Sequence, residues 1–199
     1  MPKAQDEPWT SRRIHDVSMS LFPDRIPAPN ARSYAGVLCQ VVGHSLFVQS
    51  TIAPTKVPKG FHLRGPRRWN PSPGRSMRIS VILAAEANGS GGPALLPREL
   101  RVRRRPQAIP LAEREQWART RLACHGLLMA PDSAAICGEQ ESGYQDRPPI
   151  AWVRLSGVAE VIDHRAATEA LVKGIGRGKP YGMGLVRLIG PPDGEVIQA

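Results

Sequence analysis

The segment with the strongest chemical signal spans residues 174–185, GIGRGKPYGMGL. Five of its first eleven residues are glycines, and two cations and an aromatic residue stand among them. Glycine lets the backbone adopt positive φ and approach a ligand without a Cβ in the way. Successive exposed N–H groups in such turns form anion-binding concavities. The segment is therefore predicted to hold phosphate through Lys173, Gly174, Gly176, Arg177, Gly178, Lys179 and Tyr181.

Two common phosphate motifs do not fit this segment. A Walker A loop requires Ser or Thr after Gly178-Lys179, where the chain has Pro180, and a dinucleotide fingerprint requires glycine at position 179. Both motifs also run from strand through loop into helix, whereas here an apparent helix precedes the loop and an apparent strand follows it. The alternative is a turn that only reverses the chain, with Tyr181 packing it down.

A second basic feature lies between Pro97 and Pro106. Because Leu100 and Val102 alternate with its cations, we expect a short ribbon that contacts nucleic-acid phosphates and reads groove shape. An ordinary solvated surface is the alternative, although no acid follows Glu99 within the run. The cations are Arg98, Arg101, Arg103, Arg104 and Arg105.

The composition is typical of a protein that binds a polyanion. The 199 residues include 27 Lys and Arg against 17 Asp and Glu, for a formal charge of +10 and a pI near 10.4. Each phosphate that such a cation neutralises releases counterions, so the affinity falls as salt rises. No apolar run approaches the ~20 residues that span a bilayer, and the N-terminus lacks an apolar signal segment. We therefore expect no membrane partner and a cytoplasmic location.

The cysteines and acids argue against a metal centre. Cys39, Cys124 and Cys137 are odd in number and lack C-x-x-C spacing, which disfavours both a disulfide framework and a zinc site. No cluster of Asp and Glu stands at ligand spacing for another metal. We expect a reducing compartment and no metal or organic cofactor.

The second half of the chain is predicted to form a βαββαβ unit, the ferredoxin-like pattern. The segment around Gly138 is expected to be irregular because it is followed by further Gly and Pro residues. The expected elements are a strand at 77–87, a helix at 111–125, a strand at 126–130, a strand pair at 150–162 broken near Gly157, a helix at 166–173 and a strand at 183–189.

The helix at 111–125 carries charges of both signs. Arg114, Arg119 and Arg121 share this helix with Glu113 and Glu115 and are expected to form a salt-paired face. Trp117 is expected in the core.

The first half is predicted to supply the αββ part of the same pattern. Residues 11–21 indicate a helix that Ser11 could cap, with Ile14, Val17 or Ser18, and Leu21 on one face. Apolar runs at 35–42 and 46–51 predict a hairpin, and a proline-rich stretch follows to residue 73. We expect an α+β protein of tandem ferredoxin-like domains, residues 1–74 and 75–199, the first lacking its leading strand.

Several segments, in order, resemble one known family. Residues 170–188, ALVKGIGRGKPYGMGLVRL, resemble the C-terminal signature of the RAMP superfamily of repeat-associated RNA-binding proteins. Within it the chain most resembles the CasE-type CRISPR endoribonucleases of type I-E Cascade, with type IV relatives as the alternative. The likeness extends to Ile14-His15, residues 20–24 (SLFPD), residues 83–88 (LAAEAN) and Gln116-Trp117.

The resemblance implies that His15 is the catalytic residue of a metal-independent cleavage. In that reaction the ribose 2′-OH attacks the adjacent phosphate and leaves a 2′,3′-cyclic phosphate and a 5′-OH. Histidine suits this step because its ordinary pKa of about 6.5 makes both protonation states accessible. Where the family often has tyrosine, this chain has Arg12, which stays protonated and could stabilise the transition state. The alternative is that Arg12 and Arg13 only grip backbone phosphates.

The resemblance further implies the partners. The protein would bind the stem-loop of a CRISPR repeat, cleave precursor CRISPR RNA at its base and stay bound beside other effector-complex subunits. Two rival interpretations are a non-catalytic hairpin-binding assembly subunit and a metal-dependent nuclease. The RNA would be held by Arg13, Arg101, Arg103, Arg104, Arg105 and the glycine-rich segment.

Overall fold

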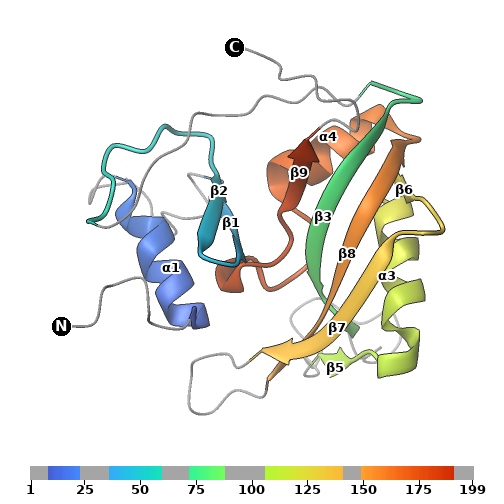
Figure 1. Ribbon diagram of the computed structural model, residues 1–199, viewed down its shortest axis with the longest axis horizontal. Helices are drawn as coiled ribbons and strands as arrows, with labels where there is room; N and C mark the ends of the chain where they lie inside the picture. The colour runs from blue at the N-terminus through green and yellow to red at the C-terminus, as the bar shows by residue number, and fades with distance from the viewer. Residues whose placement is uncertain (1–8, 23–35, 60–71, 88–105, 141–148, 191–199) are drawn as a thin grey trace, which may run out of the picture.

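The chain forms helices and mainly antiparallel strands in an α+β arrangement (Figure 1). The structure is a computed structural model that describes residues 9–22, 36–59, 72–87, 106–140 and 149–190. In Figure 1, helix α1 and the β1–β2 hairpin lie on one side, and a five-stranded sheet with α3 and α4 lies on the other.

The sheet has the strand order of a ferredoxin-like unit. Its strands are β3 (Ser76–Ala84), β6 (Leu127–Met129), β7 (Ala134–Gln140), β8 (Ile150–Val161) and β9 (Val186–Gly190). They run in the order β6-β8-β3-β9, all antiparallel, with β7 continuing beside β8 where β6 ends. The βαββαβ pattern expected from the sequence is confirmed, with its second strand divided into β6 and β7.

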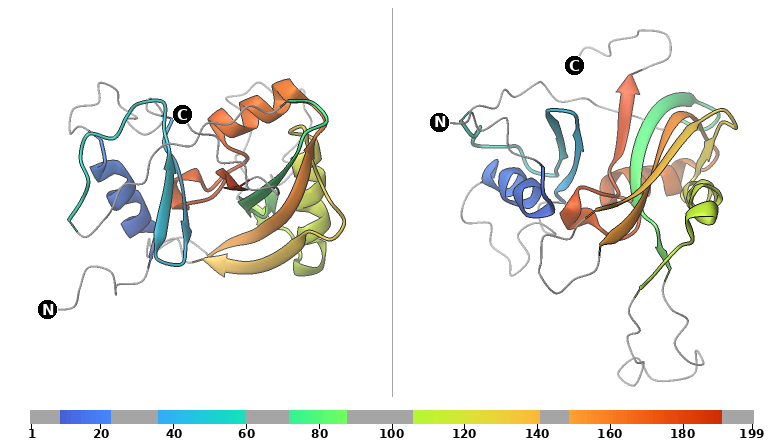
Figure 2. Two further views of the ribbon diagram at one scale, coloured as in Figure 1. Left: turned by 45° about the horizontal axis from the view of Figure 1, so that its top comes forward. Right: turned by 60° about the horizontal axis from the view of Figure 1, so that its bottom comes forward.

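One face of this sheet forms the main core. Side chains alternate between the two faces of a strand, and Ile79, Val81 and Leu83 of β3 are at most 1% exposed. They pack in one cluster with residues of α3 (Arg114–Ala123) and α4 (His164–Lys173), which cover this face. The helices therefore leave the opposite face of the sheet turned toward the first half of the chain (Figure 2).

Two sequence expectations about the sheet are wrong, and in both a glycine was taken to interrupt a strand. Residues 134–140 form a strand rather than an irregular segment, because Gly138 makes room for its cross-strand partner: a Cβ there would lie 2.5 Å from Trp152 Cζ2. Strand β8 is continuous through Gly157, where a Cβ would collide with Ser133 Oγ. Both glycines admit close neighbours and do not end strands.

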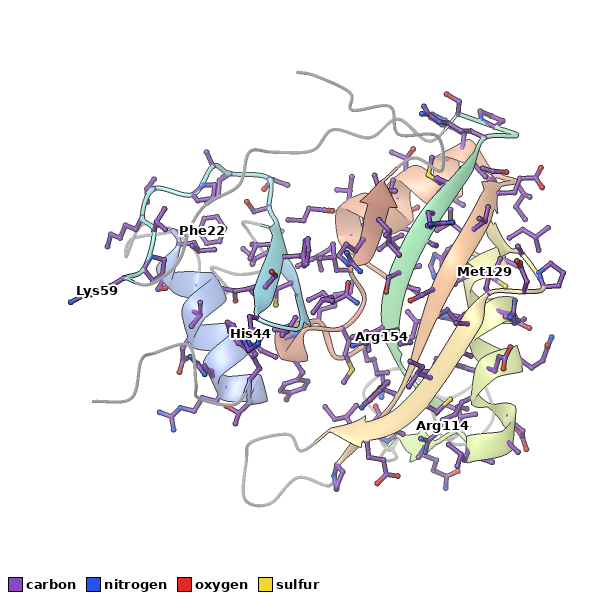
Figure 3. All side chains as sticks on the ribbon, in the orientation of Figure 1. Phe22, His44, Lys59, Arg114, Met129 and Arg154 are labelled. Carbon is purple, nitrogen blue, oxygen red and sulfur yellow. The ribbon has the colours of Figure 1, made fainter. Side chains whose placement is uncertain are left out.

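The expected salt-paired face on α3 is partly wrong. A short helix η2 (Leu111–Glu113) leads into α3, and Arg119 pairs with Glu115 at 2.9 Å as expected. Arg114, however, is 5% exposed and donates to the carbonyl oxygens of Ile109 and Gly138, so it ties α3 to β7 (Figure 3). Arg121 has no ion-pair partner among the described residues.

The first half contains the expected helix and hairpin. Helix α1 spans Ser11–Ser20, and Thr10 caps it rather than Ser11, since Thr10 Oγ1 accepts from the Arg13 N–H at 3.2 Å. Strands β1 (Leu38–Val42) and β2 (Ser45–Gln49) form the hairpin, with His44 at its tip (Figure 3). No strand precedes α1 within the described residues 9–10. The division into domains 1–74 and 75–199 stays a prediction.

The two halves meet along the segment between α4 and β9. The Gln49 side chain donates to the carbonyl oxygen of Leu171 at 2.5 Å, and the Arg187 guanidinium lies 4.6 Å from the centroid of the Phe47 ring. Residues 174–185 lie between these contacts and α1 (Figure 1). All three cysteines are free. Within the described ranges, no helix is long and apolar enough to cross a membrane.

Candidate nucleic-acid interface

The glycine-rich segment is a loop held at both ends by regular structure. Helix α4 begins at an Asp163 cap, whose Oδ1 accepts from the Ala166 N–H at 3.0 Å, and ends at Gly174. The following strand, expected from Met183, begins at Val186, and residues 183–185 belong to the loop. One short helix, η3 (Lys179–Tyr181), lies inside it.

Half of the loop is structural. The N–H of Ile175 donates to Gly184 O at 2.9 Å, and the N–H of Gly184 donates to Ile82 O at 2.7 Å, so the loop is fastened to β3. Gly184 has a φ of +81°, and a Cβ there would lie 2.6 Å from Ile175 O. Gly174, predicted to bind phosphate, is buried, and a Cβ there would lie 2.9 Å from a Leu38 methyl group.

The other half of the loop faces solvent. Gly176 and Arg177 are exposed, and no atom lies within 4 Å of the place where a Gly176 Cβ would be. The N–H groups of Gly176 and Gly178 donate no hydrogen bond to any residue in the described part of the chain. Two available N–H donors beside a guanidinium form the arrangement that binds an anion. Phosphate binding by the loop therefore stays a prediction, and it now concerns residues 176–179 only.

Helix α1 packs directly against this loop. Ile14 is 4% exposed and lies 3.5 Å from the place where a Gly182 Cβ would be. His15, the next residue, is half-buried, and its Nδ1 atom is buried without a hydrogen-bond partner among the described residues. A buried nitrogen without a partner is uncommon in proteins.

The two arginines before His15 have different surroundings. Arg12 lies 3.7 Å from Asp16 with both side chains well exposed, a pairing that contributes little in water. The Arg13 guanidinium lies 4.9 Å from the ring centroid of Trp9. Both cations lie on the helix that carries His15.

Two predicted RNA-binding side chains are engaged elsewhere. Lys173 Nζ lies 2.6 Å from Glu169 Oε1, and this hydrogen bond lowers the pKa of the Glu169 carboxyl. Tyr181 packs against Met183 and its apolar neighbours, which is the alternative that the sequence left open. Arg101, Arg103, Arg104 and Arg105 lie outside the described residues. The short strands β4 (Glu86–Ala87) and β5 (Gln107–Ala108), which flank that run, pair with each other and lead away from the sheet (Figure 2).

Sequence reasoning missed one cationic group, on the helical side of the loop. Arg121 and Trp117 of α3 line a cavity together with Gly176 and Arg177. Close by, burial lowers the pKa of His125 and the charge of Arg121 lowers it further, whereas Glu169 raises it and Lys179 makes the smallest contribution, which lowers it. The spacing of Trp117 and Arg121, one helical turn apart, could have indicated a shared face. No group of three potential metal ligands occurs in the described ranges.

Comparisons with known proteins identify the family and support the fold. A family model described as CRISPR associated protein matches residues 3–189, whereas no curated protein matches the sequence. The fold is similar to that of Thermus thermophilus Cse3 bound to an RNA representing a pre-cleavage complex (TM-score 0.65, 18% identity, 90% of this chain and 88% of that chain). It is also similar to Cas6e from Escherichia coli K-12 (TM-score 0.62, 19% identity, 90% and 91%).

A third solved structure is closer in sequence. A chain of a CRISPR RNA-guided surveillance complex, pre-nicking, is 26% identical with a TM-score of 0.57, over 90% of this chain and 89% of that chain. The family match confirms the resemblance read from the sequence, and the structural matches confirm the fold.

Proposed function

Since the chain belongs to the CRISPR-associated protein family, we propose that it is an endoribonuclease that binds the stem-loop of a CRISPR repeat and cleaves precursor CRISPR RNA. The observation that carries this proposal is the packing of α1 on the glycine-rich loop. That packing places the helix of His15 against η3 and Gly182, in the same loop that exposes Gly176 and Arg177.

The cleavage step requires a base for the ribose 2′-OH. His15 takes that proton, the 2′-oxygen attacks the adjacent phosphorus, and the bond from phosphorus to the 5′-oxygen breaks. The leaving oxygen takes up a proton, so the products are a 2′,3′-cyclic phosphate and a 5′-OH, and no metal takes part. Because Nδ1 is buried, the ring nitrogen that meets the ribose is Nε2, and the half-buried ring makes no hydrogen bond to a described residue that would compete with this role. Arg12 stabilises the charge that builds up on the phosphate.

The names of the similar structures support the substrate. Cse3 was solved with a bound RNA, and the chain at 26% identity belongs to an RNA-guided surveillance complex. We infer that this protein keeps its cleaved hairpin and is a subunit of a Cascade-like complex with other effector subunits.

A non-catalytic hairpin-binding subunit is the second candidate. It is favoured by Arg12, which is highly exposed and pairs with Asp16, where the family often has a tyrosine.

A cleavage assay on a repeat hairpin in excess EDTA separates the candidates. Persistent cleavage supports the proposal, binding without cleavage supports the assembly subunit, and sensitivity to EDTA supports a metal-dependent nuclease. His15→Ala should lower the cleavage rate by about 10²–10⁴-fold while leaving the hairpin Kd nearly unchanged. His44→Ala, at the exposed hairpin tip, is the matched control. Cleavage that continues unchanged in His15→Ala removes this residue from the mechanism.

A further inference from the structure

The cavity beside the glycine-rich loop has no role in the cleavage step. Its volume is about 270 Å³, and residues of β3, β4, α3 and the glycine-rich loop line it. Helix α3 contributes Trp117 and Arg121, the loop contributes Gly176 and Arg177, and the chain just after β3 contributes Glu86. The volume lies below the ~300–1,000 Å³ of sites for drug-sized ligands, so a small unit such as one nucleotide is the suitable occupant.

The walls combine the groups that recognise a nucleotide. Trp117 is half-buried against the core and presents a fixed aromatic surface, on which a base gains about 1–3 kcal/mol by stacking. Arg121 is exposed without an acidic partner among the described residues, and a guanidinium binds phosphate through two hydrogen bonds. The unused N–H of Gly176 adds a donor for the same phosphate.

The potential around the cavity is positive. Arg121 of α3 and Arg177 of the loop both line the cavity, against the single carboxylate of Glu86.

We propose that this cavity binds one unpaired nucleotide of the RNA, with its base on Trp117 and its phosphate between Arg121 and Arg177. The identification of the ligand as RNA rests on the proposed function. Glu86 is half-buried at the wall, and its carboxylate can only accept hydrogen bonds. Guanine offers two adjacent donors on its Watson–Crick edge, whereas uracil offers one. The cavity therefore selects guanine over uracil.

Titration of the whole protein with mononucleotides tests this proposal. We expect guanosine monophosphate to shift the NMR signals of the Trp117 indole and the His125 ring, and to bind about tenfold more tightly than uridine monophosphate. Trp117→Ala and Arg121→Gln should each weaken guanosine monophosphate at least about tenfold. Glu86→Gln should keep the binding and abolish the preference for guanine. Trp152→Phe, on the opposite face of the sheet, is the control.

The outcomes separate this site from the proposed function. If millimolar guanosine monophosphate leaves both signals unchanged, or if inorganic phosphate binds as tightly as either nucleotide, the nucleotide site is wrong even when the hairpin is cleaved. If guanosine monophosphate binds as expected but no repeat hairpin is bound or cleaved, the site stands and the proposed function fails.

Discussion

Lysines and arginines of equal charge differ here in what they can offer to RNA. Lys173 is committed to Glu169 at 2.6 Å, whereas Arg177 stands at the exposed tip of the loop beside two unused N–H groups. A phosphate that binds at Lys173 must compete with the Glu169 carboxylate. A phosphate that binds at Arg177 can also accept hydrogen bonds from the neighbouring N–H groups of the loop. The contribution of each cation to binding is thus decided by its neighbours.

Arg177→Ala should therefore weaken hairpin binding and reduce its salt dependence by about one ion equivalent, because one phosphate contact is lost. Lys173→Ala, at the last residue of helix α4, is the matched control and should change the slope less, because Glu169 already neutralises this lysine. The measurement is log Kd against log salt for both variants. Equal slopes for the wild type and Arg177→Ala would show that the loop tip does not touch phosphate.

His125 should make stability depend on pH. Its pKa is lowered from 6.5 in the folded protein, so the unfolded chain takes up a proton first as the pH falls. The free energy of unfolding should fall as the pH drops through about 6.5, and level off below the folded pKa. Denaturant unfolding between pH 5 and pH 8 checks this dependence.

Arg121→Gln removes one cause of the His125 shift. It should therefore raise the pKa of His125 and weaken the dependence of stability on pH. NMR titration of the ring measures the change. A His125 pKa that stays the same in Arg121→Gln would contradict the assigned cause.

At the scale of elements, the glycine-rich loop joins a structural half to an exposed half. The structural half depends on Gly184, which combines a φ of +81° with a Cβ position 2.6 Å from Ile175 O. Gly43 in the hairpin turn has a φ of +57° and no atom within 4 Å of its Cβ position. Alanine substitutions at Gly184 and Gly43 therefore separate the free-energy cost of a strained backbone conformation from the cost of a steric clash.

Gly184→Ala should lower the free energy of unfolding by roughly 2–5 kcal/mol, the sum of conformational strain and overpacking. Gly43→Ala should cost only the strain, about 1–2 kcal/mol. Denaturant unfolding of both variants gives the comparison. If the two variants lose the same stability, the loop moves away from Ile175 at little cost and its bracing role is wrong.

At the scale of the whole molecule, the proposed reaction needs both halves at once. His15 comes from the first half, the loop cations come from the second, and the halves meet through contacts such as Phe47 with Arg187. If the contacts between the two halves were weakened, His15 and the loop cations would no longer be held in one site.

Phe47→Ala should lower the free energy of unfolding by roughly 1–3 kcal/mol and reduce cleavage more than it reduces binding of guanosine monophosphate, whose cavity lies wholly in the second half. Val57→Ala, at a residue 48% exposed, is the control and should change stability by less than about 0.5 kcal/mol. If Phe47→Ala cleaves at the wild-type rate, the contact between Phe47 and Arg187 does not position His15.

The sequence by itself determined the local elements and the basic character of the protein. Apolar periodicity is a local signal, so α1, α4 and the hairpin followed from it, and the net charge of +10 indicated a polyanion. The family resemblance rested on contiguous motifs such as residues 170–188 and needed no tertiary contact.

Only the tertiary structure decided which side chains share a site. Gly138 and Gly157 have the local appearance of breaks, but the strands continue because Trp152 and Ser133 occupy the space that a Cβ would need. Arg114 and Arg121 lie on one helix, yet one is buried against backbone carbonyls and the other lines a cavity with the loop. Contacts between residues far apart in the chain depend on how the sheet and helices pack, and no local pattern in the sequence encodes them.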